Sequence, residues 1–194
     1  METTNILLAG VGGQGVLLAS QIFTSVAIEA DLDVKQSEVH GMSQRGGSVT
    51  SHVRFGSKVY SPTIDPGEAD FLIGFERLET LRNLHCLKPG GTVIYNSMRI
   101  NPSTVAAGVA DYPDDVAAQI AAFGEKAYEI DGLGLGQQAG NPRSSNVVMV
   151  GAVSSFLSLP ESLWEEKIRQ LLPPKLVELN LKAFHLGREA VKGK

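Results

Sequence analysis

The sequence contains a single cysteine among its 194 residues, which excludes an internal disulfide and an iron–sulfur cluster held by this chain alone. Leu84 and Leu87 lie close to Cys86 in the sequence, so we interpret this thiol as a buried structural residue. No apolar run approaches the roughly 20 residues needed to cross a bilayer, and the N-terminus has no signal-peptide pattern. We therefore expect a cytoplasmic protein with no membrane partner.

The sequence also lacks an excess of basic residues. It has 17 lysines and arginines against 21 aspartates and glutamates, which gives a net charge of −4. Proteins that bind nucleic acids normally gather a basic excess on one face, so this balance argues against a nucleic-acid partner. Hydrophobic residues make up 43% and charged residues 20% of the chain, as in an ordinary globular protein. The length suits a single domain over residues 1–194.

Segments typical of strands and helices alternate along the chain. Continuous apolar runs predict buried parallel strands, and the strands are expected over residues 5–9, 33–36, 70–75, 92–96 and 127–130. Periodic apolar residues predict helices over 16–30, 78–84, 114–123, 147–159, 161–172 and 175–190. A hairpin is expected where 48–55 and 58–61 flank Gly56-Ser57, and the glycine-rich segment 132–140 is expected to be a mobile or ligand-side loop. The predicted fold is α/β, a three-layer, Rossmann-like, mainly parallel mixed sheet with one β-hairpin and C-terminal helices.

A glycine-rich turn connects the first predicted strand to the first helix. Its candidate binding residues are Gly10, Gly12, Gly13, Gln14 and Gly15. The glycines fit the G-x-G-x-x-G spacing, and glycine permits positive φ and a close approach of the backbone. The turn either serves tight packing or partner contact, or it binds a phosphate, nucleotide or dinucleotide at the start of the helix. For a dinucleotide, Glu38 is the nearest acidic partner for a ribose hydroxyl.

A second polar loop over residues 37–47 is expected at the same sheet edge. Its candidate residues are Ser37, Glu38, His40, Gln44, Arg45, Gly46 and Gly47. An imidazole can act as an acid or base near neutral pH, and a guanidinium can bind a carboxylate or phosphate; a solvated connection is the other interpretation. Arg143 and Asn146 precede an apolar helix and can point to the same edge, although a helix-capping role explains this segment equally well.

Together, residues 10–16 (GVGGQGV) and 37–47 (SEVHGMSQRGG) resemble the gamma-type domain of the 2-oxoacid:ferredoxin oxidoreductases. The resemblance extends over essentially the whole chain, including residues 143–151, and is strongest to the beta subunits of the branch that oxidises indolepyruvate. It implies a subunit of an enzyme that oxidatively decarboxylates aryl-2-oxoacids, with coenzyme A as acyl acceptor and ferredoxin as electron acceptor.

The same resemblance implies which cofactors belong to other chains. The family uses thiamine diphosphate with Mg²⁺, and its electrons leave through [4Fe–4S] clusters. This sequence has one cysteine and no Gly-Asp-Gly stretch followed by an asparagine, so it is expected to bind none of these cofactors alone and to contain no catalytic residue. A large thiamine- and cluster-bearing subunit is the expected partner, with ferredoxin reached indirectly.

Two questions stay open at the level of sequence. The two loops are expected to face the large subunit, either with coenzyme A as a further contact or as a pure scaffold. The alternative to this whole interpretation is a stand-alone dinucleotide- or nucleotide-binding Rossmann-type enzyme or sensor, which is favoured by the same glycine spacing.

Overall fold

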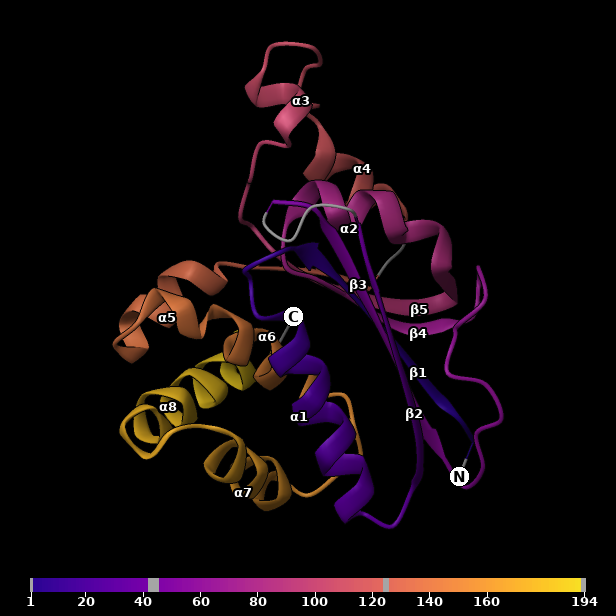
Figure 1. Ribbon diagram of the computed structural model, residues 1–194, viewed down its shortest axis with the longest axis vertical. Coiled ribbons are helices and arrows are strands. Elements are labelled where there is room, and N and C mark those ends of the chain that lie inside the picture. The colour runs from indigo at the N-terminus through magenta and orange to yellow at the C-terminus, as the bar shows by residue number, and fades with distance from the viewer. Residues whose placement is uncertain (1, 42–45, 124–125, 193–194) are drawn as a thin grey trace.

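The computed structural model describes residues 2–41, 46–123 and 126–192, which form one six-stranded sheet covered by helices (Figure 1). The strands are β1 (Thr4–Val11), β2 (Asp33–His40), β3 (Ser48–Gly56), β4 (Ala69–Gly74), β5 (Leu87–Asn96) and β6 (Ala127–Ile130). Their order in the sheet is β2-β3-β1-β4-β5-β6. Strands β1, β4, β5 and β6 pair in parallel, whereas β3 runs antiparallel to both β1 and β2.

Helices cover both faces of the sheet, so the predicted three-layer α/β architecture is confirmed. The helices are α1 (Val16–Glu29), α2 (Arg77–Asn83), α3 (Ser103–Ala106), α4 (Val116–Phe123), α5 (Gly132–Ala139), α6 (Ser145–Ser154), α7 (Glu161–Leu171) and α8 (Pro174–Ala190), with 3-10 turns at Leu84–Cys86 and Pro142–Ser144. Across the described residues, no helix combines the length and apolar character that a membrane span requires.

The central strand β1 is buried on both faces because its side chains alternate between two cores. Ile6 and Leu8 pack with α1, α6, α7 and α8, whereas Leu7 and Ala9 pack with α2 and α4. This period of two is the geometry of any strand. A parallel strand covered on both sides therefore appears in the sequence as a continuous apolar run, as predicted for this segment.

Helix α6 is buried along its length because α8 approaches its backbone directly. A Cβ atom on Gly151 would lie 2.0 Å from the Phe184 carbonyl oxygen, and one on Gly187 would lie 1.9 Å from the Val148 carbonyl oxygen. Only glycine permits backbones to come this close. The contact fixes α6, which carries Asn146 near its N-terminus. The predicted buried helix is present, but it ends at Ser154 rather than at residue 159.

The prediction that residues 48–55 pair with residues 58–61 in a hairpin is wrong. Residues 58–61 form no strand, and β3 pairs instead with β2, the strand that precedes it in the sequence. Because β1 occupies the other edge of β3, no edge is left for a following strand. Strand β2 also continues four residues beyond Gln36, which places Ser37, Glu38 and His40 in the sheet rather than in a loop.

The segment 132–140, predicted as a loop, forms helix α5 instead. The Asp131 carboxylate caps this helix by accepting a hydrogen bond of 2.8 Å from the Gly134 N–H. A Cβ atom on Gly136 would lie 3.0 Å from the Ser145 backbone nitrogen, so this glycine permits close packing against the start of α6. Glycine therefore signals tight helix packing here rather than disorder of the chain.

Partly buried His52 makes the fold sensitive to acid. Its Nδ1 atom accepts a hydrogen bond of 3.1 Å from the Ile64 N–H, which requires an unprotonated nitrogen. Burial, with a smaller contribution from the charge of Arg54, lowers the pKa of His52 below its ordinary value. The folded protein therefore resists a proton that the unfolded chain accepts at about pH 6.5.

We predict that the free energy of unfolding falls as the pH drops from about 7.5 to 5.5, because protonation of His52 favours the unfolded chain. In His52→Gln this pH dependence becomes shallower, as measured by urea unfolding at each pH. The matched control is His85→Gln, which removes an exposed imidazole. Equal slopes for the wild type and His52→Gln would contradict the assignment.

Candidate functional site

The glycine turn between β1 and α1 is held closed by the side chain of Gln14. Its Oε1 atom accepts a hydrogen bond of 2.7 Å from the Val11 N–H, and its Nε2 atom donates one of 2.8 Å to the Phe75 carbonyl. The Gln14 amide therefore ties the turn to the end of β4. Sequence analysis considered a ligand or a neighbouring subunit as its partner, but within the described chain these backbone groups occupy it.

Gly15 brings α1 against the start of α6. It adopts a φ of 78° as the residue that precedes α1, and Asn146 Nδ2 donates to its carbonyl oxygen at 3.4 Å. A Cβ atom at this position would lie 2.4 Å from the same Nδ2 atom. Asn146 thus lies at the turn, which is one of the two positions that the sequence left open, and a larger residue in place of Gly15 would have to displace the Asn146 side chain.

A cavity of about 490 Å³ opens beside the turn. Its lining residues are Gly13, Gln14, Gly15, Met98, Leu133, Pro142, Arg143, Ser145 and Asn146. Gly15, which lines this cavity, precedes helix α1, and the helix begins without a side-chain cap and without an acidic residue in its first turn. The first residues of the helix, Val16 and Leu17, line a different cavity. Arg143 is exposed, and within the described chain its guanidinium makes no hydrogen bond or ion pair. An uncapped helix N-terminus beside a free guanidinium suits an anionic group such as a phosphate.

The end of the second loop contacts the turn through the backbone. The Gly12 N–H donates a hydrogen bond of 2.9 Å to the Gly47 carbonyl oxygen. The structure thus joins the two predicted loops at the carboxyl edge of β1. Gly46 lies next to this contact and has a φ of 77°. Gln44 and Arg45, which sequence analysis also assigned to this site, lie outside the described residues.

A second cavity, of about 350 Å³, lies on the other side of the turn. It is lined by Glu38 and His40 together with Gly13 and Gly15, and His40 Nε2 lies 3.3 Å from Glu38 Oε1. Side chains alternate along a strand, so Ser37 faces the opposite side of β2 and is not part of this cavity. The structure therefore brings two of the three predicted β2 residues to the turn.

Sequence analysis did not single out Glu76, which directly follows β4. This carboxylate is only 1% exposed, and it accepts hydrogen bonds from the Glu79 N–H (2.9 Å), the Ile100 N–H (3.2 Å) and the Tyr112 hydroxyl (2.7 Å). Burial and the bond to Glu76 raise the pKa of Tyr112. The sequence signal for Glu76 is an acidic residue at the position that caps α2. No local pattern indicates the donors at Ile100 and Tyr112, which lie far away in the sequence.

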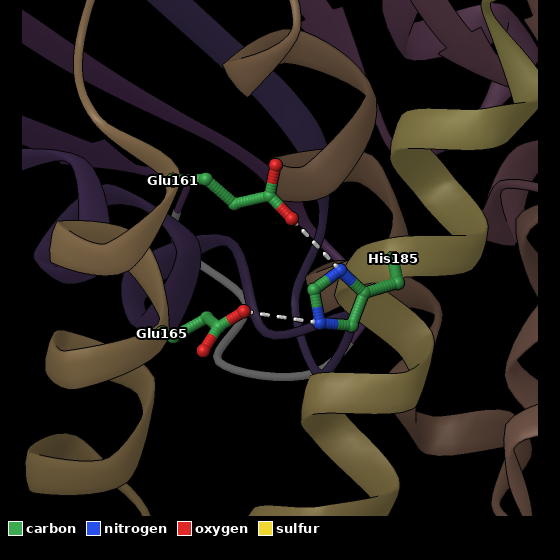
Figure 2. Close-up of side chains that lie close together, drawn as sticks. All are labelled: Glu161, Glu165 and His185. Carbon is green, nitrogen blue, oxygen red and sulfur yellow. Dashed lines mark ion pairs between the residues drawn. The ribbon is translucent and has the colours of Figure 1, made fainter.

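A third polar group joins α7 and α8, away from the glycine turn (Figure 2). His185 Nδ1 lies 3.2 Å from Glu161 Oε1, and His185 Nε2 lies 3.3 Å from Glu165 Oε1. Arg188 pairs with the other oxygen of Glu161 at 3.1 Å. Each ring nitrogen faces a different carboxylate, which is the geometry of an ion-pair cluster between two helices.

The structure is an open α/β sheet with a glycine turn and an uncapped helix at its carboxyl edge, and in sheets of this class ligands generally bind at that edge. The family model described as "Pyruvate ferredoxin/flavodoxin oxidoreductase" matches residues 5–190. The chain belongs to this family, and the resemblance predicted from the sequence is confirmed.

Individual relatives agree with this assignment. The chain is 42% identical to indolepyruvate oxidoreductase subunit IorB of Thermococcus kodakarensis, and the match covers 99% of this chain and 98% of the relative. A keto/oxoacid ferredoxin oxidoreductase gamma subunit from Geobacter sulfurreducens has the same fold, with a TM-score of 0.74, 24% identity, and coverage of 98% of this chain and 99% of that one.

A third match lies within a longer chain. The 2-oxoglutarate:ferredoxin oxidoreductase of Magnetococcus marinus, solved with 2-oxoglutarate, coenzyme A and succinyl-CoA, gives a TM-score of 0.77 at 21% identity. The match covers 100% of this chain but only 32% of that one. In that protein the same fold is therefore one part of a larger polypeptide.

We predict that Gly15→Ala destabilises the protein more than Gly13→Ala. Both glycines have positive φ, which costs an alanine about 1–3 kcal/mol, but only Gly15 contacts Asn146, since nothing lies within 4 Å of a Cβ on Gly13. The contact adds roughly 1–3 kcal/mol. Urea unfolding measures the difference, and adding Asn146→Ala should recover part of it. Equal losses at the two glycines would refute this account.

Proposed function

We propose that this chain is the small, accessory subunit of an indolepyruvate (aryl-2-oxoacid):ferredoxin oxidoreductase and works with a larger subunit. The identity of 42% to a subunit of that name over nearly its full length supports this substrate class. The single observation on which the role depends is that the glycine turn, up to the residue that precedes α1, and Arg143 line one cavity.

The redox chemistry belongs to the larger subunit in this proposal. Its thiamine diphosphate, with Mg²⁺, supplies the decarboxylation chemistry, and its [4Fe–4S] clusters pass the electrons to ferredoxin. Cys86 of this chain does not fit a cluster, because it is the only cysteine in the sequence and is buried. Burial also raises the pKa of the Cys86 thiol, which disfavours the thiolate that a metal requires.

The contribution of this chain is to hold coenzyme A at the subunit interface. The phosphate groups of coenzyme A are the anions that the Arg143 guanidinium and the first N–H groups of α1 favour. Gln14 and Asn146 act indirectly, because their amides are bonded to the backbone of the turn and fix its shape. Glu38 and His40 lie across the turn and are available for polar contacts with the larger subunit.

A stand-alone nucleotide-binding protein is the alternative, and one observation favours it. Glu38 lies in a cavity with the glycine turn, as an acidic residue that binds a ribose hydroxyl would. In a doubly wound dinucleotide fold, however, the second strand lies beside the first, whereas here β3 separates β2 from β1. Calorimetry of the isolated chain with NAD, FAD and S-adenosylmethionine discriminates, because saturable micromolar binding of one of them would support the alternative.

We predict that Arg143→Ala raises the apparent KM of the assembled enzyme for coenzyme A by about 10- to 100-fold, because a charge-assisted hydrogen bond contributes about 1.5–3 kcal/mol. The KM for the 2-oxoacid should stay unchanged in the same steady-state assay. Arg169→Ala is the matched control, since Arg169 is an exposed arginine on α7.

Two outcomes would count against the proposal. An unchanged KM for coenzyme A in Arg143→Ala would reduce the chain to a scaffold without ligand contact. Full oxidoreductase activity in the larger subunit alone, together with failure of the two chains to copurify, would remove the accessory role altogether.

A further inference from the structure

Between β5 and α4 the chain leaves the sheet in a long excursion, residues 97–115, which we call the arm. Figure 1 shows its helix α3 at the far end of the molecule, beyond α4. None of the four residues of α3 is buried. A helix of this length is not stable by itself in water, and connections this long in a compact domain are usually functional.

The base of the arm is held firmly, whereas in its tip only Val105 packs against the core. The buried Glu76 carboxylate accepts hydrogen bonds from both ends of the arm, namely from the Ile100 N–H and from the Tyr112 hydroxyl. The Arg99 guanidinium lies 4.1 Å from the centre of the Tyr112 ring, which closes the base further. Because Glu76 is itself the cap of α2, the arm is rigidly oriented relative to the sheet.

The arm stands at the same edge of the sheet as the glycine turn. The Arg77 N–H donates a hydrogen bond of 3.1 Å to the Met98 carbonyl, and Gln14 Nε2 lies 3.4 Å from Met98 Sδ. Met98 also lines the cavity beside the turn. The arm is therefore continuous with the surface that faces the larger subunit in the proposed function.

The tip of the arm, residues 100–110, is mostly exposed and combines small apolar residues with the polar residues Asn101, Ser103 and Thr104. It contains no charged residue, and Val109 is 78% exposed with exposed alanines on both sides of it in the sequence. Solvated loops usually carry charges, and exposed apolar surface of this kind marks sites of interaction. Without charges the tip can form no ion pair, so its recognition rests on burial of its apolar residues, with hydrogen bonds from Asn101, Ser103 and Thr104 beside them.

We propose that the tip of the arm inserts into an apolar groove of the larger oxidoreductase subunit and anchors the two chains together. This inference rests on the proposed function, because that function supplies the larger subunit. The Magnetococcus protein supports this occupant, since the same fold makes up only 32% of a longer chain there and so has other domains as covalent neighbours.

The test introduces a charge at the tip by Val109→Lys. In coexpression with a tagged larger subunit, we expect copurification of this chain to fall at least tenfold. The isolated variant should keep its thermal midpoint, because the Val109 side chain is exposed. The matched control is Ile28→Lys, which replaces another exposed β-branched residue (59%) near the end of α1, at the opposite edge of the sheet.

The outcomes separate this inference from the proposed function. If wild-type chains fail to copurify, the proposed function itself is wrong. If wild type and Val109→Lys copurify equally well, the accessory role stands and the docking arm is refuted. A wild-type chain that dimerises alone, with a monomeric Val109→Lys variant in gel filtration, would assign the tip to a second copy and overturn the inference. Protection of residues 99–111 from hydrogen exchange only in the complex would support it.

Discussion

The structure at the carboxyl edge of β1 depends on one constraint, the close contacts that the backbone of the glycine turn makes with distant segments. The Gly12 N–H reaches the Gly47 carbonyl, and the Gly15 carbonyl receives the amide of Asn146. Three segments that are far apart in the sequence therefore meet within hydrogen-bond distance. A side chain at Gly15 would occupy the space that Asn146 fills, so the turn can join these segments only if it stays glycine.

The rest of the fold keeps the partners of the turn in place. Gly151 on α6 and Gly187 on α8 each allow the backbone of the other helix to come close, which holds α6 against α8. Helix α6 carries Asn146. On the other side, Glu76 caps α2 and binds the base of the arm. Buried polar groups are costly unless their hydrogen bonds are satisfied, and the three donors to Glu76 satisfy this carboxylate. The domain thus presents one edge at which the cavity beside the glycine turn and the arm lie next to each other, joined by Met98.

Sequence patterns predicted most of the elements, and their errors have physical causes. The segments over 16–30, 70–75 and 127–130 have strong periodicity or continuous apolar character, and the structure has α1, β4 and β6 there. The hairpin was misplaced because Gly56-Ser57 has turn chemistry, but both edges of β3 are already paired. The glycines of 132–140 indicated a loop, whereas the Asp131 cap and packing against α6 form a helix.

The candidate site was only partly predictable for a similar reason. The glycine turn, Glu38, His40, Arg143 and Asn146 were recognisable from local residue chemistry. The internal bonding of the Gln14 amide and the convergence of donors on Glu76 depend on distant residues, such as Phe75, which lies 61 positions from Gln14. No local pattern encodes such contacts.

The sequence by itself determined the α/β class, the glycine turn and the family, because these follow from short-range periodicity and from motifs of adjacent residues. Only the tertiary structure decided which strand pairs with which, which polar side chains are used internally, and that the Arg143 guanidinium has no partner among the described residues. These properties depend on which distant groups compete for the same hydrogen-bond partners and the same space, and that competition exists only once the chain has folded.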